Sequence, residues 1–177
     1  MNTIIPVVSL MISILAFVGT LVIYAITRRR ENYQNLLQRI SVYFSPEMHT
    51  AVRQLWSLYR NYGDPAFLDK YIEIMVADNK KMHSIKVADR MEYQSSTLHY
   101  QRRIVSSFYR GLGILLRNGL VPSRATFETW GAEDIDLVGK VIIPIENRLC
   151  EFNNVKKMNP KTHALYYIAN LRNRFQG

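Results

Sequence analysis

Residues that could bind a metal ion are present in this chain but do not converge. The four histidines are scattered, and none has a carboxylate three residues before it: His49, His83, His99 and His163. A metal site in a helical protein needs ligands on one face, as in Glu-x-x-His or His-x-x-x-His. We therefore expect no metal ligands among these residues.

Residues that could act as nucleophiles or as acid–base catalysts are also not arranged as such sites require. The single cysteine, Cys150, falls on the apolar side of an expected helix, which favours a core position over a nucleophile. Glu133, Asp134 and Asp136 point in different directions around a helix, so a solvated helix start explains them better than an acid pair or a cation site. No GxSxG, GxxxxGK[ST] or GxGxxG motif occurs. We expect no catalytic residue, no cofactor and no enzymatic activity.

Basic residues give the one functional lead. Arg103, Arg110 and Arg117 are seven residues apart and line the polar side of one expected helix. Other basic residues could extend this face: Arg102, Arg124, Lys156, Lys157, Arg172 and Arg174. Such a face suits anionic lipid headgroups or an acidic protein. The alternatives are an ordinary solvated face, or a nucleotide or nucleic acid stacked on the neighbouring aromatic rings.

The elements that must position these arginines divide the chain into two parts. Of 177 residues, 23 are Lys or Arg and 14 are Asp or Glu, and none of these lies in residues 1–27. Residues 4–27 would form about 36 Å of helix against a hydrocarbon core of about 30 Å. This stretch is too long for a cleaved signal peptide, and its charges follow it. We expect a transmembrane anchor over 1–30 and a helical domain over 31–177.

Arg28, Arg29 and Arg30 follow the span directly and are expected at the lipid headgroups. Because Lys- and Arg-rich flanks stay in the cytoplasm, they predict a single-pass protein of the bacterial inner membrane with its N-terminus outside. The bulk of the chain would then be cytoplasmic.

Small residues recur on one side of the span. Ser9, Ser13, Ala16 and Thr20 are spaced four, three and four apart, which places them on one helical face. Such a face lets another helix approach closely. The alternative is chance, because small residues are common in membrane helices.

The domain is expected to be all-α, because its hydrophobic period is close to 3.6 residues and no stretch alternates cleanly. An apolar stripe should continue from the span: Tyr33, Leu36, Leu37, Ile40 and Phe44. Helix starts are predicted at Ser45-Pro46, Asp64-Pro65 and Asn159-Pro160. A loop is expected over 78–83, and a long helix over 87–118 with a break near Ser95. Gly131 should separate two helices and Pro144 should kink the second.

One stretch, from Arg102 to Arg148, resembles a known family. It carries an aromatic-x-x-Leu-Gly pattern at the end of an amphipathic helix, then a Trp, and then an apolar helix with Pro and a closing Arg. The matching positions are Phe108 or Tyr109, Leu112, Gly113, Leu116, Gly119, Leu120, Trp130, Pro144 and Arg148. This stretch resembles the core of a bacterial family of small membrane-anchored helical proteins that is catalogued as a domain of unknown function. The resemblance implies a membrane-tethered helical module without enzymatic activity.

These features together predict a non-catalytic accessory or scaffold subunit of a larger membrane assembly. Its expected partners are membrane lipid and other transmembrane subunits, or further copies of itself. The alternative is a self-assembling membrane effector of the bacterial defence type, whose domain senses a nucleotide or a similar signal.

Overall fold

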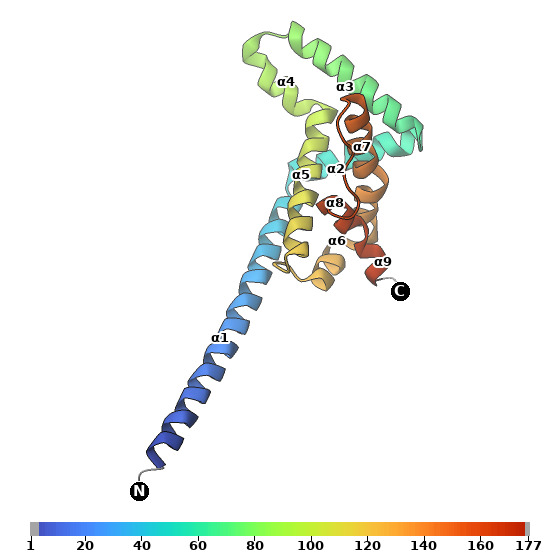
Figure 1. The fold of residues 1–177 in the computed structure, drawn as a ribbon. Helices are drawn as coiled ribbons and strands as arrows, with labels where there is room; N and C mark the ends of the chain where they lie inside the picture. Colours follow the sequence, from blue (N-terminus) through green and yellow to red (C-terminus); the bar gives the residue numbers. More distant parts are fainter. Residues whose placement is uncertain (1–3, 176–177) are drawn as a thin grey trace.

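The computed structural model describes residues 4–175; the side chains of 4–8 and of Arg172, a candidate for the basic face, lie outside the description. Within this range every regular element is helical, as predicted. Figure 1 shows a long helix that projects from a cluster of shorter ones.

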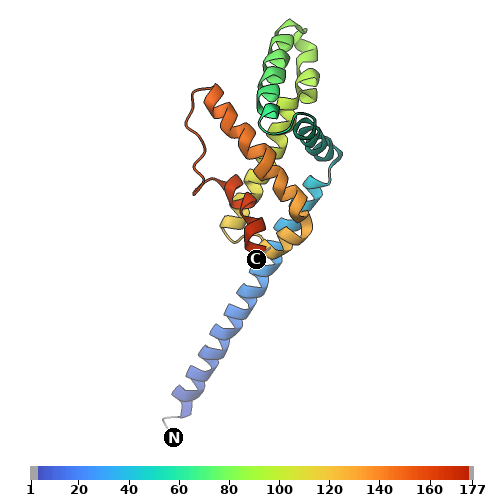
Figure 2. The same ribbon diagram turned by 90° about the vertical axis from the view of Figure 1, so that its right-hand side faces the viewer.

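The first element, α1 (Ile4–Tyr43), is one uninterrupted helix of 40 residues. At about 1.5 Å per residue it is roughly 60 Å long, about twice the thickness of a bilayer's hydrocarbon core. It is the one helix in the described part of the chain that is long and apolar enough to cross a membrane. The apolar stretch of α1 is not buried by the domain. It projects away from the domain as a single helix (Figures 1 and 2).

The end of α1 packs against the domain through fewer residues than predicted. Leu36 and Tyr43 are buried and Ile40 is half-buried. The other three residues of the expected stripe are 54%, 63% and 56% exposed: Tyr33, Leu37 and Phe44. Successive residues are about 100° apart around a helix. A domain that covers Leu36 and Tyr43 therefore leaves the next residue after each of them at its edge.

Two helices begin close to their predicted starts, α2 (Pro46–Tyr62) and α3 (Ala66–Ser84). The Ser45 hydroxyl accepts a hydrogen bond of 3.3 Å from the backbone N–H of Met48, which caps α2. Gly63 ends α2, as predicted. Pro65 precedes α3, which starts without a side-chain cap.

The polar stretch over 78–83, predicted as a loop, is helical and forms the last turns of α3. It holds no glycine or proline that would break a helix. Its polarity has another cause. α3 and the following helix α4 (Arg90–Ser96) form a hairpin that protrudes from the domain, so the residues near its tip face solvent (Figure 1).

The break predicted within the long helix near Ser95 is confirmed. After the short turn η1 (Val87–Asp89) and α4, the chain bends at Thr97 and continues as α5 (Leu98–Arg117). Thr97 caps α5, because its Oγ1 accepts a hydrogen bond of 3.3 Å from the N–H of Tyr100.

The next segment, α6 (Ser123–Leu137), is bent at Gly131, where the sequence predicted a boundary between two helices. Its φ of 68° at Gly131 is a conformation that glycine adopts without strain. A π-helical turn, η2 (Val138–Ile142), then leads into α7 (Ile143–Phe152). Pro144 lies in the first turn of α7, where its missing N–H costs little, and the irregular turn falls just before it.

The helix predicted from Asn159-Pro160 starts later. Asn159 forms a turn, in which its Oδ1 accepts a hydrogen bond of 2.9 Å from the N–H of Lys161. His163 then caps α8 (Ala164–Ala169), and a last short helix follows, α9 (Leu171–Phe175). The expected cap residues are thus used by a turn rather than by a helix.

The core is centred on α5, which packs between α2 and α8. Large, fully buried side chains come from most elements of the domain: Leu55, Tyr71, Tyr109, Leu112, Ile142 and Leu165. Each stabilises the fold by roughly 1.5–3 kcal/mol through burial. At Gly113 a Cβ would lie 2.3 Å from the carbonyl oxygen of Ala164, so the close approach of α5 and α8 requires glycine at this position.

Candidate functional site

The turn between α5 and α6 is held against α1 just beyond the apolar stretch. The side-chain amide of Asn32 donates a hydrogen bond of 3.2 Å to the carbonyl oxygen of Gly119. That of Asn35 donates one of 3.4 Å to the carbonyl oxygen of Leu120. These amides donate to carbonyl groups of the turn that follows α5, which are not bonded within a helix. The sequence analysis did not single them out, although their i, i+3 spacing places both on one helical face.

Further along α1, its residues meet earlier parts of α5. The guanidinium group of Arg39 lies against Gly111. The ring of Tyr43 lies 5.5 Å from that of Phe108, centroid to centroid. The contacts therefore move back along α5 as they move forward along α1, so the two helices are antiparallel.

This arrangement places the predicted arginine stripe along the helix axis rather than across it. Arg103, Arg110 and Arg117 are all exposed on α5. Arg117 lies at the end nearest the span, and Arg103 is about 21 Å further from it, at about 1.5 Å per residue. The three side chains therefore lie at three different distances from the apolar stretch of α1.

Two of these arginines contact the connection between α7 and α8. Arg110 Nη2 lies 3.2 Å from Nε2 of His163, and Arg117 Nη1 donates a hydrogen bond of 2.6 Å to the carbonyl oxygen of Thr162. Arg103 instead lines an open pocket beside α4, together with Tyr100 and Ser107. The stripe is therefore divided between two environments.

Arg102, which the sequence analysis added to the basic face, is not part of it. It is only 8% exposed and forms an ion pair with Glu146 of α7. Being one residue from Arg103, it points about 100° away, toward the core. The sequence signal for this pairing was a carboxylate at Glu146 beside the apolar residues Ile142, Ile145 and Leu149 of the same helical side.

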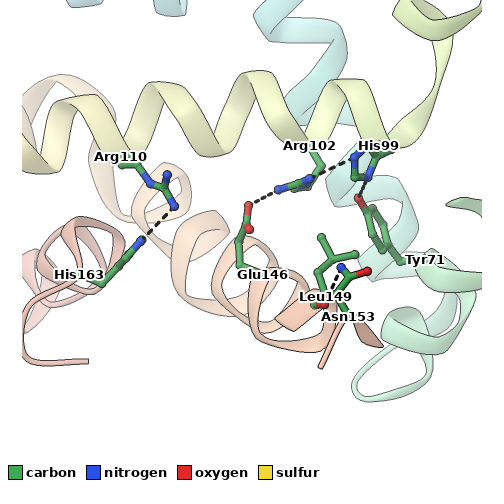
Figure 3. A network of polar contacts seen from close by, with 8 residues as sticks. All are labelled: Tyr71, His99, Arg102, Arg110, Glu146, Leu149, Asn153 and His163. Atoms are coloured by element: carbon green, nitrogen blue, oxygen red, sulfur yellow. Dashed lines mark hydrogen bonds and ion pairs between the residues drawn. The ribbon is translucent and has the colours of Figure 1, made fainter. Parts of the chain in front are cut away.

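The Arg102–Glu146 pair is the centre of a polar network that joins α3, α5 and α7 (Figure 3). Arg102 Nη2 lies 3.5 Å from Nε2 of His99, whose Nδ1 lies 3.1 Å from the hydroxyl of Tyr71. Because arginine only donates hydrogen bonds, Nε2 of His99 is the acceptor. The proton of the neutral ring is therefore on Nδ1 and points to Tyr71.

The neutral state of His99 has a physical cause. Burial lowers the pKa of His99, and the positive charges of Arg102 and Arg103 lower it further. Burial also raises the pKa of Tyr71, so its hydroxyl stays protonated. The network thus contains one charged pair and two neutral groups, an arrangement suited to fixing three helices together.

An open pocket of about 490 Å³ borders this network and exposes Cys150. Cys150 is half-buried, so the expectation that it lies in the core is only partly correct. The pocket also contains Asn79 and Asn153. Its one guanidinium and its one carboxylate, Arg102 and Glu146, are already paired with each other. In the described residues no group of three His, Cys, Asp or Glu side chains is placed to hold a metal ion.

A second polar contact ties the end of α1 to α6. The hydroxyl of Tyr43 donates a hydrogen bond to Asp134. Burial raises the pKa of Asp134, whereas the Tyr43 hydroxyl lowers it. The sequence correctly placed Asp134 in the first turn after Gly131 but took it as solvated, whereas it is half-buried. Its neighbour Asp136 pairs with Lys140 at 2.8 Å.

The small-residue face of the apolar stretch is exposed along its length: Ser9, Ser13, Ala16 and Thr20. Two of its hydroxyls donate hydrogen bonds within the helix. Ser13 donates to the carbonyl oxygen of Ser9 at 2.9 Å and Thr20 to that of Ala16 at 2.8 Å. The face therefore presents small side chains, and the hydroxyl donors of Ser13 and Thr20 are satisfied, which is compatible with an apolar environment. Arg28, Arg29 and Arg30 are exposed at the end of this stretch.

In comparisons with known proteins, no family model, curated protein or solved structure matches the chain significantly. The resemblance over Arg102 to Arg148 therefore stays a prediction.

Proposed function

We propose that this chain is a single-pass protein of the bacterial inner membrane, with its N-terminus outside. Its helical domain would act by contact, as an accessory or scaffold subunit of a larger membrane assembly. In this proposal it has no catalytic residue of its own.

The observation that supports this proposal most strongly is the continuity of α1. The apolar stretch and the domain are joined by helix, with no flexible linker between Arg30 and Asn32. The hydrogen bonds of Asn32 and Asn35 fix the domain to that helix within about a turn and a half of the arginines. A domain tethered in this way has a fixed height and a fixed rotation relative to the membrane, which suits docking onto neighbouring subunits.

The surface proposed for a partner helix is the small-residue face of the span. To test it, the C-terminally tagged chain is purified from native membranes in mild detergent, and the polypeptides that accompany it are identified. We expect distinct partners at a fixed ratio. The variant Ser13→Leu with Ala16→Leu should lose them, because larger side chains keep a helix from approaching closely.

A matched control uses the opposite side of the same helix. Val18→Phe with Val22→Leu adds similar bulk to the exposed far face and should retain the partners. Purification of the chain alone, or equal loss in both variants, would contradict the proposed docking face. A homo-oligomer would favour a self-assembling effector instead.

A second candidate function, nucleotide sensing by such an effector, has one supporting observation. Tyr100 and Arg103 share an open pocket of about 750 Å³ between α4 and α5, a volume within the range of small-molecule sites. An aromatic ring and a guanidinium group suit a base and a phosphate. A panel of nucleotides should then raise the melting temperature of the wild type and not of Arg103→Ala. If no nucleotide shifts the wild type, this candidate fails.

A further inference from the structure

The end of the domain nearest the span gathers basic and apolar side chains from separate segments. The bonds of Asn32 and Asn35 fix the α5–α6 turn only two to five residues beyond Arg30, or about 3–8 Å along the helix. Leu120 in this turn is 38% exposed. Arg117 ends α5 immediately before it and is also exposed.

The first turns of α6 and the end of α9 lie at the same end of the domain (Figures 1 and 2). The rings of Phe127 and Phe175 stack at 5.3 Å, which brings α9 beside α6. Phe175 is 39% exposed and Arg174 is exposed beside it. We call this region the leaflet-side surface and define it by five residues: Arg117, Leu120, Arg124, Arg174 and Phe175.

The arginines of the leaflet-side surface can reach an external anion. The side chain of Arg124 is 83% exposed, and its bond to Glu128 at 2.9 Å is a solvent-exposed pair of the kind that contributes little. Arg174 lies over the ring of Tyr167 at 4.5 Å, which orients its guanidinium without neutralising it. Glu31 adds one negative charge beside Arg28, Arg29 and Arg30, so positive charge predominates at this end.

We propose that the leaflet-side surface binds anionic phospholipid headgroups, with its guanidinium groups on phosphates and with Leu120 and Phe175 in the interfacial layer. The inference rests on the proposed insertion of α1. Lipid is favoured over an acidic protein because the turn that carries Leu120 lies about one Debye length, roughly 8 Å, or less along α1 from Arg30. The first turns of α6 and the end of α9 lie at the same end of the domain. Arg103, about 21 Å further away, lies beyond that range.

The depth of this surface can be measured in the full chain. Cys150 is replaced by Ser, and single spin labels are placed at Val18, Leu120 or Met91, which is 83% exposed on the distant hairpin. The protein is reconstituted into nanodiscs of phosphatidylcholine, with or without an equal part of phosphatidylglycerol. Accessibility to oxygen and to a nickel chelate then reports depth. We expect position 18 in the hydrocarbon, position 120 at the headgroups and position 91 in water.

The role of the charges is tested by counting the phosphatidylglycerol molecules that the protein retains in native mass spectrometry. Because one basic residue near a leaflet strengthens lipid attachment by about fivefold, R117Q/R124Q/R174Q should reduce retention at least about fivefold. R117K/R124K/R174K, which keeps the charges, should retain the lipid. K80Q/K81Q/R103Q removes as much charge at exposed positions far from the span and should leave retention unchanged.

The outcomes separate this inference from the proposed function. A label at position 18 in water would overturn the membrane span itself. A buried label at position 18 with an aqueous label at position 120 would overturn only the lipid contact, as would equal lipid loss in the control. If position 120 is aqueous in nanodiscs but shielded in native membranes, the surface belongs to a protein partner and the lipid assignment is overturned.

Discussion

The hydroxyl of Tyr43, the last residue of α1, donates a hydrogen bond to Asp134, which lies 91 positions further along the chain. This contact closes the joint between the long helix and the domain at the end opposite to Asn32 and Asn35. The joint is therefore fixed at both ends, and its strength determines how rigidly the domain is held.

Removal of the Tyr43 hydroxyl should weaken this joint. In Tyr43→Phe the half-buried carboxylate of Asp134 loses its donor, and we expect a loss of about 1 kcal/mol in the free energy of unfolding. Denaturant unfolding of the detergent-solubilised chain measures it. Tyr33→Phe, at an exposed position of the same helix, is the control and should change little. Equal values for both variants would show that the contact does not stabilise the joint.

The carboxyl group of Asp134 should make the stability of the domain depend on pH. Because burial raises the pKa of Asp134, the folded state binds its proton more tightly than the unfolded state, where the value is near 3.8. Its contribution to stability therefore falls as the pH rises through the interval above 3.8. The difference in stability between wild type and Asp134→Asn, followed over this interval, should show this decline. A difference that is flat or grows with pH would contradict it.

His99 should make stability increase with pH, which is the opposite of the effect of Asp134. Burial, together with Arg102 and Arg103, lowers the pKa of His99 below 6.5. The unfolded state then binds the proton more tightly, so stability is lost as the pH falls below 6.5. Melting temperatures of wild type and His99→Gln, compared on both sides of that value, check this. The melting temperature of the wild type should fall more on acidification than that of His99→Gln. An equal fall in both proteins would refute the assignment of a neutral ring.

The Arg102–Glu146 pair should be costly to break from one side. Its side chains are 10% and 13% exposed, so Arg102→Met leaves a buried carboxylate unpaired at a cost of about 3–5 kcal/mol. Arg103→Ala, on the exposed side, should change stability by less than about 0.5 kcal/mol. The double variant R102M/E146L should recover much of the loss. If R102M and R103A are equally stable, the network has no structural role.

Most of the helices could be predicted from the sequence because their signals are local. The cap at Ser45 and the breaks near Ser95 and at Gly131 act within a few residues, and the apolar periodicity of α2 and α5 is regular. The prediction of a loop over 78–83 was wrong. The residues there are polar because they are exposed near the tip of a hairpin, and they continue the helix.

The contacts that organise the candidate site could not be predicted in this way, since they join distant segments. Helical periodicity places Arg102 and Arg103 on different sides of α5, but the carboxylate that pairs with Arg102 comes from α7, 44 positions further along the chain. The pairing of Asn32 with Gly119 likewise depends on the antiparallel course of α1 and α5. The seven-residue spacing of the arginines correctly predicted that they share one side of a helix. Their distances from the apolar stretch of α1 depend on the direction of α5, which the spacing does not give.

The most direct test of the account is whether α1 crosses the membrane with the domain inside the cell. In a Cys150→Ser background, single cysteines at Asn2, Ser13 or Met91 are treated with a membrane-impermeant maleimide on intact spheroplasts and again after lysis. We predict that position 2 is labelled on intact spheroplasts, position 91 only after lysis, and position 13 in neither case. Labelling of position 91 on intact spheroplasts, or free labelling of position 13 after lysis, would contradict the account.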